Sequence, residues 1–312
     1  MRRQKHPVAI PAINSAALAA NDKGALIIAH PGHELCVYGW LETARPKVFV
    51  LTDGTGRSGV PRLDSTTKIL TNAGATPHGS LYGRFTDLEI YNALLQGDYD
   101  LFVRLAQELA EALVVEEFTY VVGDATEGYN PTHDVCRLLI DAAVEIASRI
   151  RGRTIVNRDF LLFRRHNTHP EALRASAIWL TLDDELLERK LTLARTYPEL
   201  QGEVDAVLDQ KTLAALRAFP ELSEHVDKFV TSSMGSEAYR VECLRLVNGR
   251  ALSSEVPNEV PFYERYGEML VAAGTYQRAI RYREHFLPLV EAVRNHVHSE
   301  ISGSSARAAS PF

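Results

Sequence analysis

Three histidines follow apolar segments of the chain, and together they could hold a metal ion. His30 and His33 come directly after the apolar run Ala25–Ala29, and His133 opens a helical pattern behind a second run, Phe118–Val122. Three neutral imidazoles with an open fourth position form a known catalytic zinc set, in which the ion activates water and polarises a carbonyl. The residue types therefore predict a hydrolytic metal centre, with zinc as the expected ion and iron as the alternative.

The segments around these histidines alternate between strand and helix. Ala25–Ala29, Lys47–Leu51 and Phe118–Val122 are short apolar runs typical of buried parallel strands, and Gly32–Ala44 and His133–Ser148 carry apolar residues at helical spacing. This alternation predicts an α/β fold with a Rossmann-like parallel sheet and helices on both faces. Such sheets bind ligands at the carboxyl ends of their strands, which is where the histidines would meet.

Beyond residue 160 the pattern changes, because long helical periodicities follow at Asp183–Leu200, Glu203–Phe219 and Arg278–His298. The last residues are rich in Ser and Ala and show no apolar period. We expect four regions: a flexible N-terminal segment over 1–22, an α/β core with the metal site over 23–160, a helix-rich C-terminal extension over 161–300 and a disordered tail over 301–312.

Composition argues against several classes of partner. The net charge is −6 with both signs interspersed, so the chain offers no basic face for nucleic acid. No apolar run reaches the roughly 18 residues of a membrane-spanning helix. Cysteine occurs three times at scattered positions, which favours reduced thiols and a cytoplasmic protein. We expect a small molecule as the substrate.

The first histidine segment also carries a family resemblance. Ala29-His30-Pro31-Gly32-His33-Glu34 looks like the Ala-His-Pro-Asp-Asp-Glu signature of the LmbE/PIG-L family of zinc-dependent de-N-acetylases. Asn130-Pro131-Thr132-His133 resembles the family's His-Pro-Asp-His segment, and Lys190–Tyr197 resembles its Lys-x-x-Ala-x-x-x-Tyr helix. The resemblance implies hydrolysis of an N-acyl group on a small-molecule or sugar-derived substrate.

Transferred to this chain, the family pattern gives a metal site with altered chemistry. His30 and His133 match metal ligands, and His33 stands where the family has a metal-binding aspartate. Gly32 stands where the family's general base should be, and glycine cannot accept a proton. Asn130 and Thr132 replace a histidine and an aspartate that help to polarise the reacting centre.

Three interpretations of the altered pattern remain open. In the first, another carboxylate near the same sheet edge accepts the proton, and Tyr129 donates to the developing oxyanion. In the second, the fold carries a different metal-dependent reaction. In the third, the protein binds a ligand without turning it over. For the first we favour Asp124 among five candidates, which are Asp124, Glu127, Asp53, Glu34 and Asp134.

Four further residues are candidates for contact with the substrate. Asp53 belongs to a glycine-bearing loop at the end of a strand, and Asn130 lies in the second histidine segment. Arg84 and Asp87 fall near the family position that supplies an acidic pocket residue. Each of these two could equally be a surface salt-bridge partner.

Overall fold

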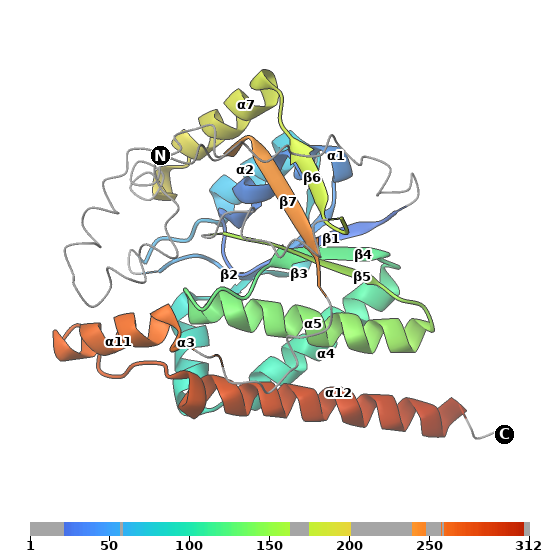
Figure 1. Ribbon diagram of the computed structural model, residues 1–312, viewed down its shortest axis with the longest axis vertical. Helices are drawn as coiled ribbons and strands as arrows, with labels where there is room; N and C mark the ends of the chain where they lie inside the picture. The colour runs from blue at the N-terminus through green and yellow to red at the C-terminus, as the bar shows by residue number, and fades with distance from the viewer. Residues whose placement is uncertain are drawn as a thin grey trace, which may run out of the picture.

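A computed structural model describes residues 22–56, 59–162, 175–200, 239–247, 257 and 259–308, which form a sheet covered by helices on both faces (Figure 1). The sheet has seven strands in the order β3-β2-β1-β4-β5-β7-β6. The strands are β1 (Gly24–Ile28), β2 (Lys47–Thr52), β3 (Thr76–Phe85), β4 (Tyr120–Asp124), β5 (Val156–Phe160), β6 (Ile178–Thr181) and β7 (Val241–Leu246).

The helices form two layers (Figure 1). One layer consists of α1 (Tyr38–Ala44), α2 (Leu63–Ala73) and α7 (Asp184–Arg195), and the 3₁₀ helices η2 (His33–Val37) and η4 (Pro198–Leu200) adjoin it. The other contains α3 (Asp87–Gln96), α4 (Tyr99–Val115), α5 (Pro131–Arg151) and α12 (Leu287–Ala308), the last preceded by the π-helical turn η7 (Tyr282–Phe286). Helix α11 (Phe262–Ala272) lies beside α3.

Strands β3, β2, β1, β4 and β5 run parallel, which confirms the predicted fold class. All residues of β1 and β4 are buried, as expected for strands covered on both faces. From β1 the chain proceeds outward to β2 and β3 on one side, and β4 begins the other side. Ligands bind at such a switch point because the connections leaving the two strands diverge there. The loops after β1 and β4 carry the three histidines.

The C-terminal half also contributes strands, which the sequence analysis did not predict. Strand β7 pairs antiparallel with β5, and β6 pairs antiparallel with β7 at the sheet edge. Both strands are short and depend on a partner far away in the chain. Local periodicity gave no signal for them, nor for the irregular strand β3, whose register with β2 shifts twice.

Several expected segments agree with the structure in part. Helix α7 and η4 account for Asp183–Leu200, and α12 continues to Ala308, into the segment expected to be a disordered tail. The N-terminal segment up to residue 21, the helix expected over Glu203–Phe219 and residues 309–312 lie outside the described residues.

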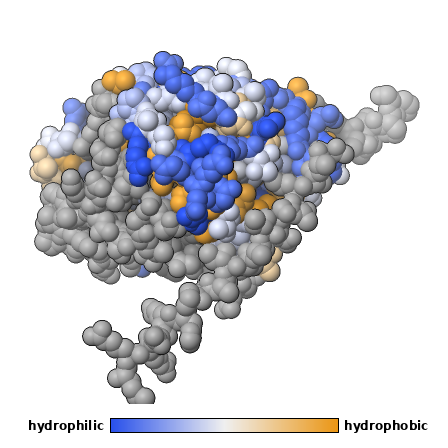
Figure 2. Space-filling model, turned by 90° about the horizontal axis from the view of Figure 1, so that it is seen from above, coloured by the Kyte–Doolittle hydropathy of each residue, from blue (hydrophilic) through white to orange (hydrophobic). Residues whose placement is uncertain are grey.

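No helix of the described ranges combines the length and apolar character needed to cross a membrane. From the side of α7, the described surface is largely hydrophilic, and its hydrophobic residues are scattered (Figure 2).

Candidate metal centre

The three predicted histidines meet at the carboxyl edge of β1 and β4. The ring centres of His30 and His33 lie 5.3 Å apart, those of His30 and His133 4.9 Å, and those of His33 and His133 4.5 Å. His33 and His133 are 100 residues apart in sequence (133 − 33), so the sheet topology alone brings them together. The convergence predicted from the two histidine segments is therefore present.

These separations can be compared with those of a zinc site. A zinc–nitrogen bond of about 2.0–2.1 Å puts each ring centre roughly 3.2 Å from the ion, and tetrahedral angles then separate ring centres by about 5 Å. In their present orientations, no three His, Cys, Asp or Glu side chains within the described ranges are arranged to hold an ion. The spacing of the ring centres matches that of three imidazoles around one ion, although the side-chain positions within the described ranges do not form a complete ligand set.

His30 is held by a carboxylate and a hydroxyl. Its Nδ1 lies 2.9 Å from Asp87 Oδ1 and 2.8 Å from Thr52 Oγ1, while Thr52 donates to the same Asp87 oxygen at 2.7 Å. Burial opposes ionisation of Asp87, but the hydrogen bonds from His30 and Thr52 outweigh it and hold the Asp87 pKa well below its usual range. An ionised carboxylate only accepts, so His30 Nδ1 carries the proton of this contact. His30 Nε2 is buried and has no hydrogen-bond partner within the described residues.

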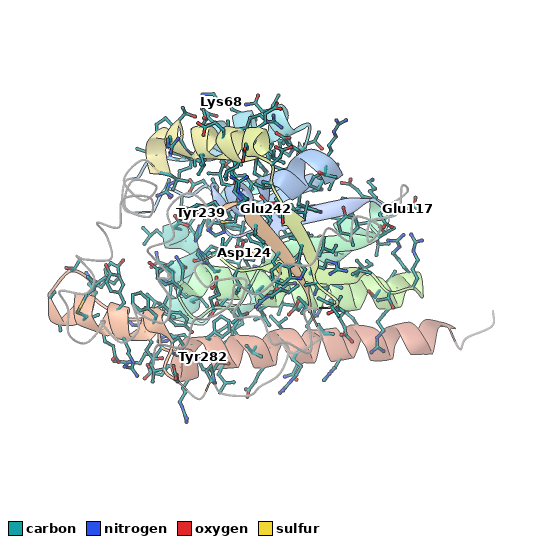
Figure 3. The ribbon with its side chains drawn as sticks, turned by 45° about the horizontal axis from the view of Figure 1, so that its top comes forward. Lys68, Glu117, Asp124, Tyr239, Glu242 and Tyr282 are labelled. Carbon is teal, nitrogen blue, oxygen red and sulfur yellow. The ribbon has the colours of Figure 1, made fainter. Side chains whose placement is uncertain are left out.

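His33 is held in the same way by Asp124, the last residue of β4. His33 Nδ1 lies 2.9 Å from Asp124 Oδ2, and the same oxygen accepts the Ala29 backbone N–H at 2.7 Å. Asp124 is fully buried in the interior of the molecule (Figure 3), and its Oδ1 has no hydrogen-bond partner within the described residues. A carboxylate that receives the second ring N–H is the usual outer partner of a metal-binding histidine, because it fixes the tautomer and the ring orientation.

His133 enters from the first turn of α5. Asn130 caps this helix by accepting the Thr132 N–H at 2.8 Å, and Pro131 occupies the first helical position, where its missing N–H costs nothing. His133 is buried, and burial together with the neighbouring His33 and His30 lowers its pKa well below the ordinary value. The ring is therefore neutral at physiological pH, which is the state in which imidazole binds a metal.

Leu200 fills the space beside Gly32 in which the family resemblance expects a general base. Gly32 has φ +106°, and a Cβ on it would lie 2.4 Å from Leu200 Cδ1. The Gly32 N–H donates to Glu34 Oε2 at 2.7 Å. A side chain at position 32 would therefore meet both an unfavourable left-handed backbone and the Leu200 side chain.

The other candidate bases already hold backbone or hydroxyl groups. Glu34 is fully buried, which raises its pKa, and accepts from Gly32 N–H and Thr66 Oγ1. Asp53 accepts from Thr55, Asp134 accepts the Glu127 N–H, and Glu127 accepts the Leu162 N–H. Asp124 also accepts a backbone N–H, and it differs from these in its contact with His33 Nδ1 and in its buried Oδ1, which takes part in no hydrogen bond within the described ranges.

Two substrate-contact candidates occupy other positions than the sequence analysis expected. Arg84 forms an exposed ion pair with Glu108 at 2.7 Å and covers the Phe85 ring, which is the surface alternative considered above. Asp87 contacts His30 directly, so it belongs to the candidate metal centre. Its role was signalled by the Thr86-x-x-Glu89 capping box, which starts α3 at the end of β3 and so carries Asp87 to the site.

Tyr129 stacks on an aromatic ring of α11. Its ring centre lies 5.0 Å from that of Phe262 with the planes 1° apart, and both residues line a cavity of about 140 Å³. Sequence analysis missed this cavity, although the spacing Phe262-Tyr263-x-x-Tyr266 marks an aromatic helix face.

No family model matches the chain, and no curated protein matches it in sequence. Among solved structures, it is similar to the pseudoaglycone deacetylase Dbv21, with 19% identity over 72% of this chain and 96% of that one, at a TM-score of 0.44. It is also similar to the zinc-inhibited form of the teicoplanin deacetylase Orf2, with 14% identity over 72% of this chain and 97% of that one, at a TM-score of 0.46. At these identities and TM-scores, the likenesses support no conclusion about the activity of this chain.

Proposed function

We propose that this protein is a metal-dependent hydrolase of the deacetylase type, with one zinc ion held by His30, His33 and His133. The observation that carries the proposal is the convergence of three imidazoles, of which two are oriented through Nδ1 by carboxylates. A bound divalent ion would supply activation of water and polarisation of an acyl carbonyl. Iron could occupy the same ligand set.

The protein side chains have separable roles in this proposal. Asp87 and Asp124 keep the Nδ1 protons of His30 and His33 in place, so that Nε2 of each ring can bind the ion. Asp124 Oδ1 is the proposed proton acceptor in place of the carboxylate that Gly32 lacks. Tyr129, at the cavity beside α5, is the proposed donor to the oxyanion.

The substrate follows from the class of reaction. We propose an N-acyl compound of small size, sugar-derived or otherwise, with Asp53 and Asn130 at the edge of its site. Asn130 lines the cavity and caps α5, and Asp53 shapes the loop after β2. Non-catalytic ligand binding on the same fold is the competing proposal, and it predicts no need for three convergent histidines.

Elemental analysis of the purified protein tests the metal. We expect about one equivalent of zinc in the wild type and less than about a tenth of an equivalent in His133→Ala, because two remaining imidazoles bind zinc weakly. His298→Ala is the matched control, since His298 lies exposed on α12. Absence of metal from the wild type after growth with added zinc would remove the proposal, and equal metal in all three proteins would show that the ion binds elsewhere.

A screen of N-acyl substrates with the zinc-loaded protein tests the hydrolysis. Release of the acyl group by the wild type, with loss of at least about a hundredfold in His133→Ala, supports the deacetylase. Stoichiometric iron together with inertness toward all N-acyl compounds would count against amide cleavage.

A further inference from the structure

A cavity at the N-terminal end of α5 is walled by aromatic side chains from four segments of the chain. They come from α3, from the loop before α5, from α11 and from the segment before η7, and we call this cavity the aromatic pocket. Its aromatic residues are Tyr91, Tyr129, Phe262, Tyr263, Tyr266 and Tyr276. Helix α11 lies against the N-terminal end of α5 (Figure 1), where the Tyr263 N–H donates to Gly128 O at 3.2 Å.

The aromatic rings form a stacked platform. Phe262 stacks on Tyr129 at 5.0 Å between ring centres and on Tyr266 at 5.6 Å, with interplanar angles of 1° and 11°. The cavity of about 140 Å³ matches the size at which an apolar protein cavity accepts a benzene ring. One six-membered planar ring therefore fits between these walls.

Polar groups in the wall are few and specific. The Tyr263 hydroxyl is buried and has no hydrogen-bond partner within the described residues. Arg278 lines the pocket with an exposed side chain, and no described residue forms an ion pair with it. Among the described lining residues none is Asp or Glu, which are groups that would bind the paired hydroxyls of a sugar.

We propose that the aromatic pocket binds an aromatic ring that carries an anionic group, with the ring stacked on Phe262 and Tyr266 and the anion paired with Arg278. Asn130 and Pro131 at the start of α5 belong to the pocket wall, so the pocket adjoins the helix that carries His133. The inference that this ring belongs to the substrate rests on the proposed hydrolase. The inference that the pocket binds the ring does not.

Saturation-transfer NMR with phenylacetate tests the pocket directly. We expect saturable, roughly millimolar binding to the wild type, since a probe of this size has little more binding energy available. Arg278→Gln should weaken it about three- to tenfold through loss of the charge-assisted contact. Arg265→Gln, an exposed arginine next to Tyr266 that does not line the pocket, should stay within about twofold.

A second pair of variants and three further probes test the ring. Tyr266→Phe should retain binding of phenylacetate and Tyr266→Leu should weaken it, because stacking requires an aromatic plane. Cyclohexylacetate should bind more weakly than phenylacetate because its ring is not aromatic. Benzyl alcohol should also bind more weakly, because it carries no charge. Tighter binding of glucuronate than of phenylacetate would overturn the aromatic ligand in favour of a sugar acid. No saturable binding, or binding unchanged in Arg278→Gln, would overturn the site.

The same titration on metal-free His133→Ala separates this inference from the proposed function. Phenylacetate should bind this variant within about threefold of the wild type, because the pocket contains no metal ligand. If phenylacetate binds this variant but the wild type contains no zinc, the inference about the pocket stands and the proposed hydrolase is refuted. If the wild type contains zinc and hydrolyses an N-acyl substrate but does not bind phenylacetate, the proposed hydrolase stands and the inference about the pocket is refuted.

Discussion

At the scale of single residues, the candidate centre depends on which ring nitrogen of each histidine is available to bind an ion. His30 and His33 both use Nδ1 on a carboxylate, which leaves Nε2 of each ring as the nitrogen that could bind an ion. The two carboxylates come from elements far apart in sequence, Asp87 from the start of α3 and Asp124 from the end of β4. An outer carboxylate of this kind typically changes metal affinity about 10- to 100-fold.

Replacing Asp124 tests this orienting role. In Asp124→Asn the amide can turn an N–H toward His33 Nδ1, so the proton on that ring moves to Nε2 and blocks the ligand atom. We expect zinc affinity to fall about 10- to 100-fold, as measured by competition with a chelator. Asp53→Asn is the control, because Asp53 holds Thr55 at the same sheet edge and contacts no histidine. Wild-type affinity in Asp124→Asn would leave Asp124 without an orienting role.

Position 32 allows a second test, on stability. Gly32→Ala places a side chain at φ +106° and against Leu200, so we expect a loss of about 2–3 kcal/mol in the free energy of unfolding. Gly152→Ala, at φ +62° with nothing within 4 Å, should cost only about 1 kcal/mol for the backbone conformation.

The double variant Gly32→Ala/Leu200→Ala shows whether the clash is real. Leu200→Ala alone should cost about 2–5 kcal/mol, and the double variant should lose less than the sum of the two single losses by about 1 kcal/mol. Strict additivity in urea unfolding would mean that Leu200 does not occupy the space beside Gly32.

At the scale of elements, a buried ion pair ties the segment that carries His33 to the C-terminal half. Glu242 of β7 accepts the Gly39 and Trp40 N–H groups at 2.9 Å each, at the N-terminal end of α1, where a negative charge is favoured. Lys190 of α7 pairs with Glu242 at 2.8 Å, and both side chains are almost completely buried. Figure 3 shows Glu242 beside Tyr239, whose carbonyl oxygen also accepts from Lys190.

Removing the Lys190 cation should therefore lower the free energy of unfolding substantially. Lys190→Met leaves the Glu242 carboxylate buried without its counterion, and we expect a loss of about 3–5 kcal/mol in the free energy of unfolding in urea. Adding Glu242→Gln should recover part of that loss, because the uncompensated charge is gone while an amide oxygen can still accept an N–H. Arg189→Met, which removes the surface ion pairs with Glu42 and Glu185, is the control and should change the free energy of unfolding far less than Lys190→Met.

At the scale of the whole molecule, the candidate metal centre joins the two histidine-bearing segments at the switch point of the sheet. Because the ligands come from loops after β1 and β4, an ion bound there stabilises the folded chain over the unfolded one. With free zinc at about 100 times its Kd, the gain is about 2.7 kcal/mol. We expect the melting temperature to rise by roughly 5 °C.

Calorimetry with and without zinc measures this gain. His133→Ala should show no rise, and His298→Ala should behave as the wild type. A similar rise in all three proteins would mean that zinc stabilises the fold from a site other than the three histidines.

The sequence by itself determined the parallel core, the three histidines and their meeting at one sheet edge. These were accessible because apolar runs mark buried strands, and because strand ends of a parallel sheet share an edge. Only the tertiary structure decided the rest. The pairing of His30 with Asp87, the filling of the Gly32 position by Leu200, strands β6 and β7, and the aromatic pocket all join residues distant in sequence. Contacts of this kind leave no local periodicity, since each partner has an ordinary pattern until the other packs against it.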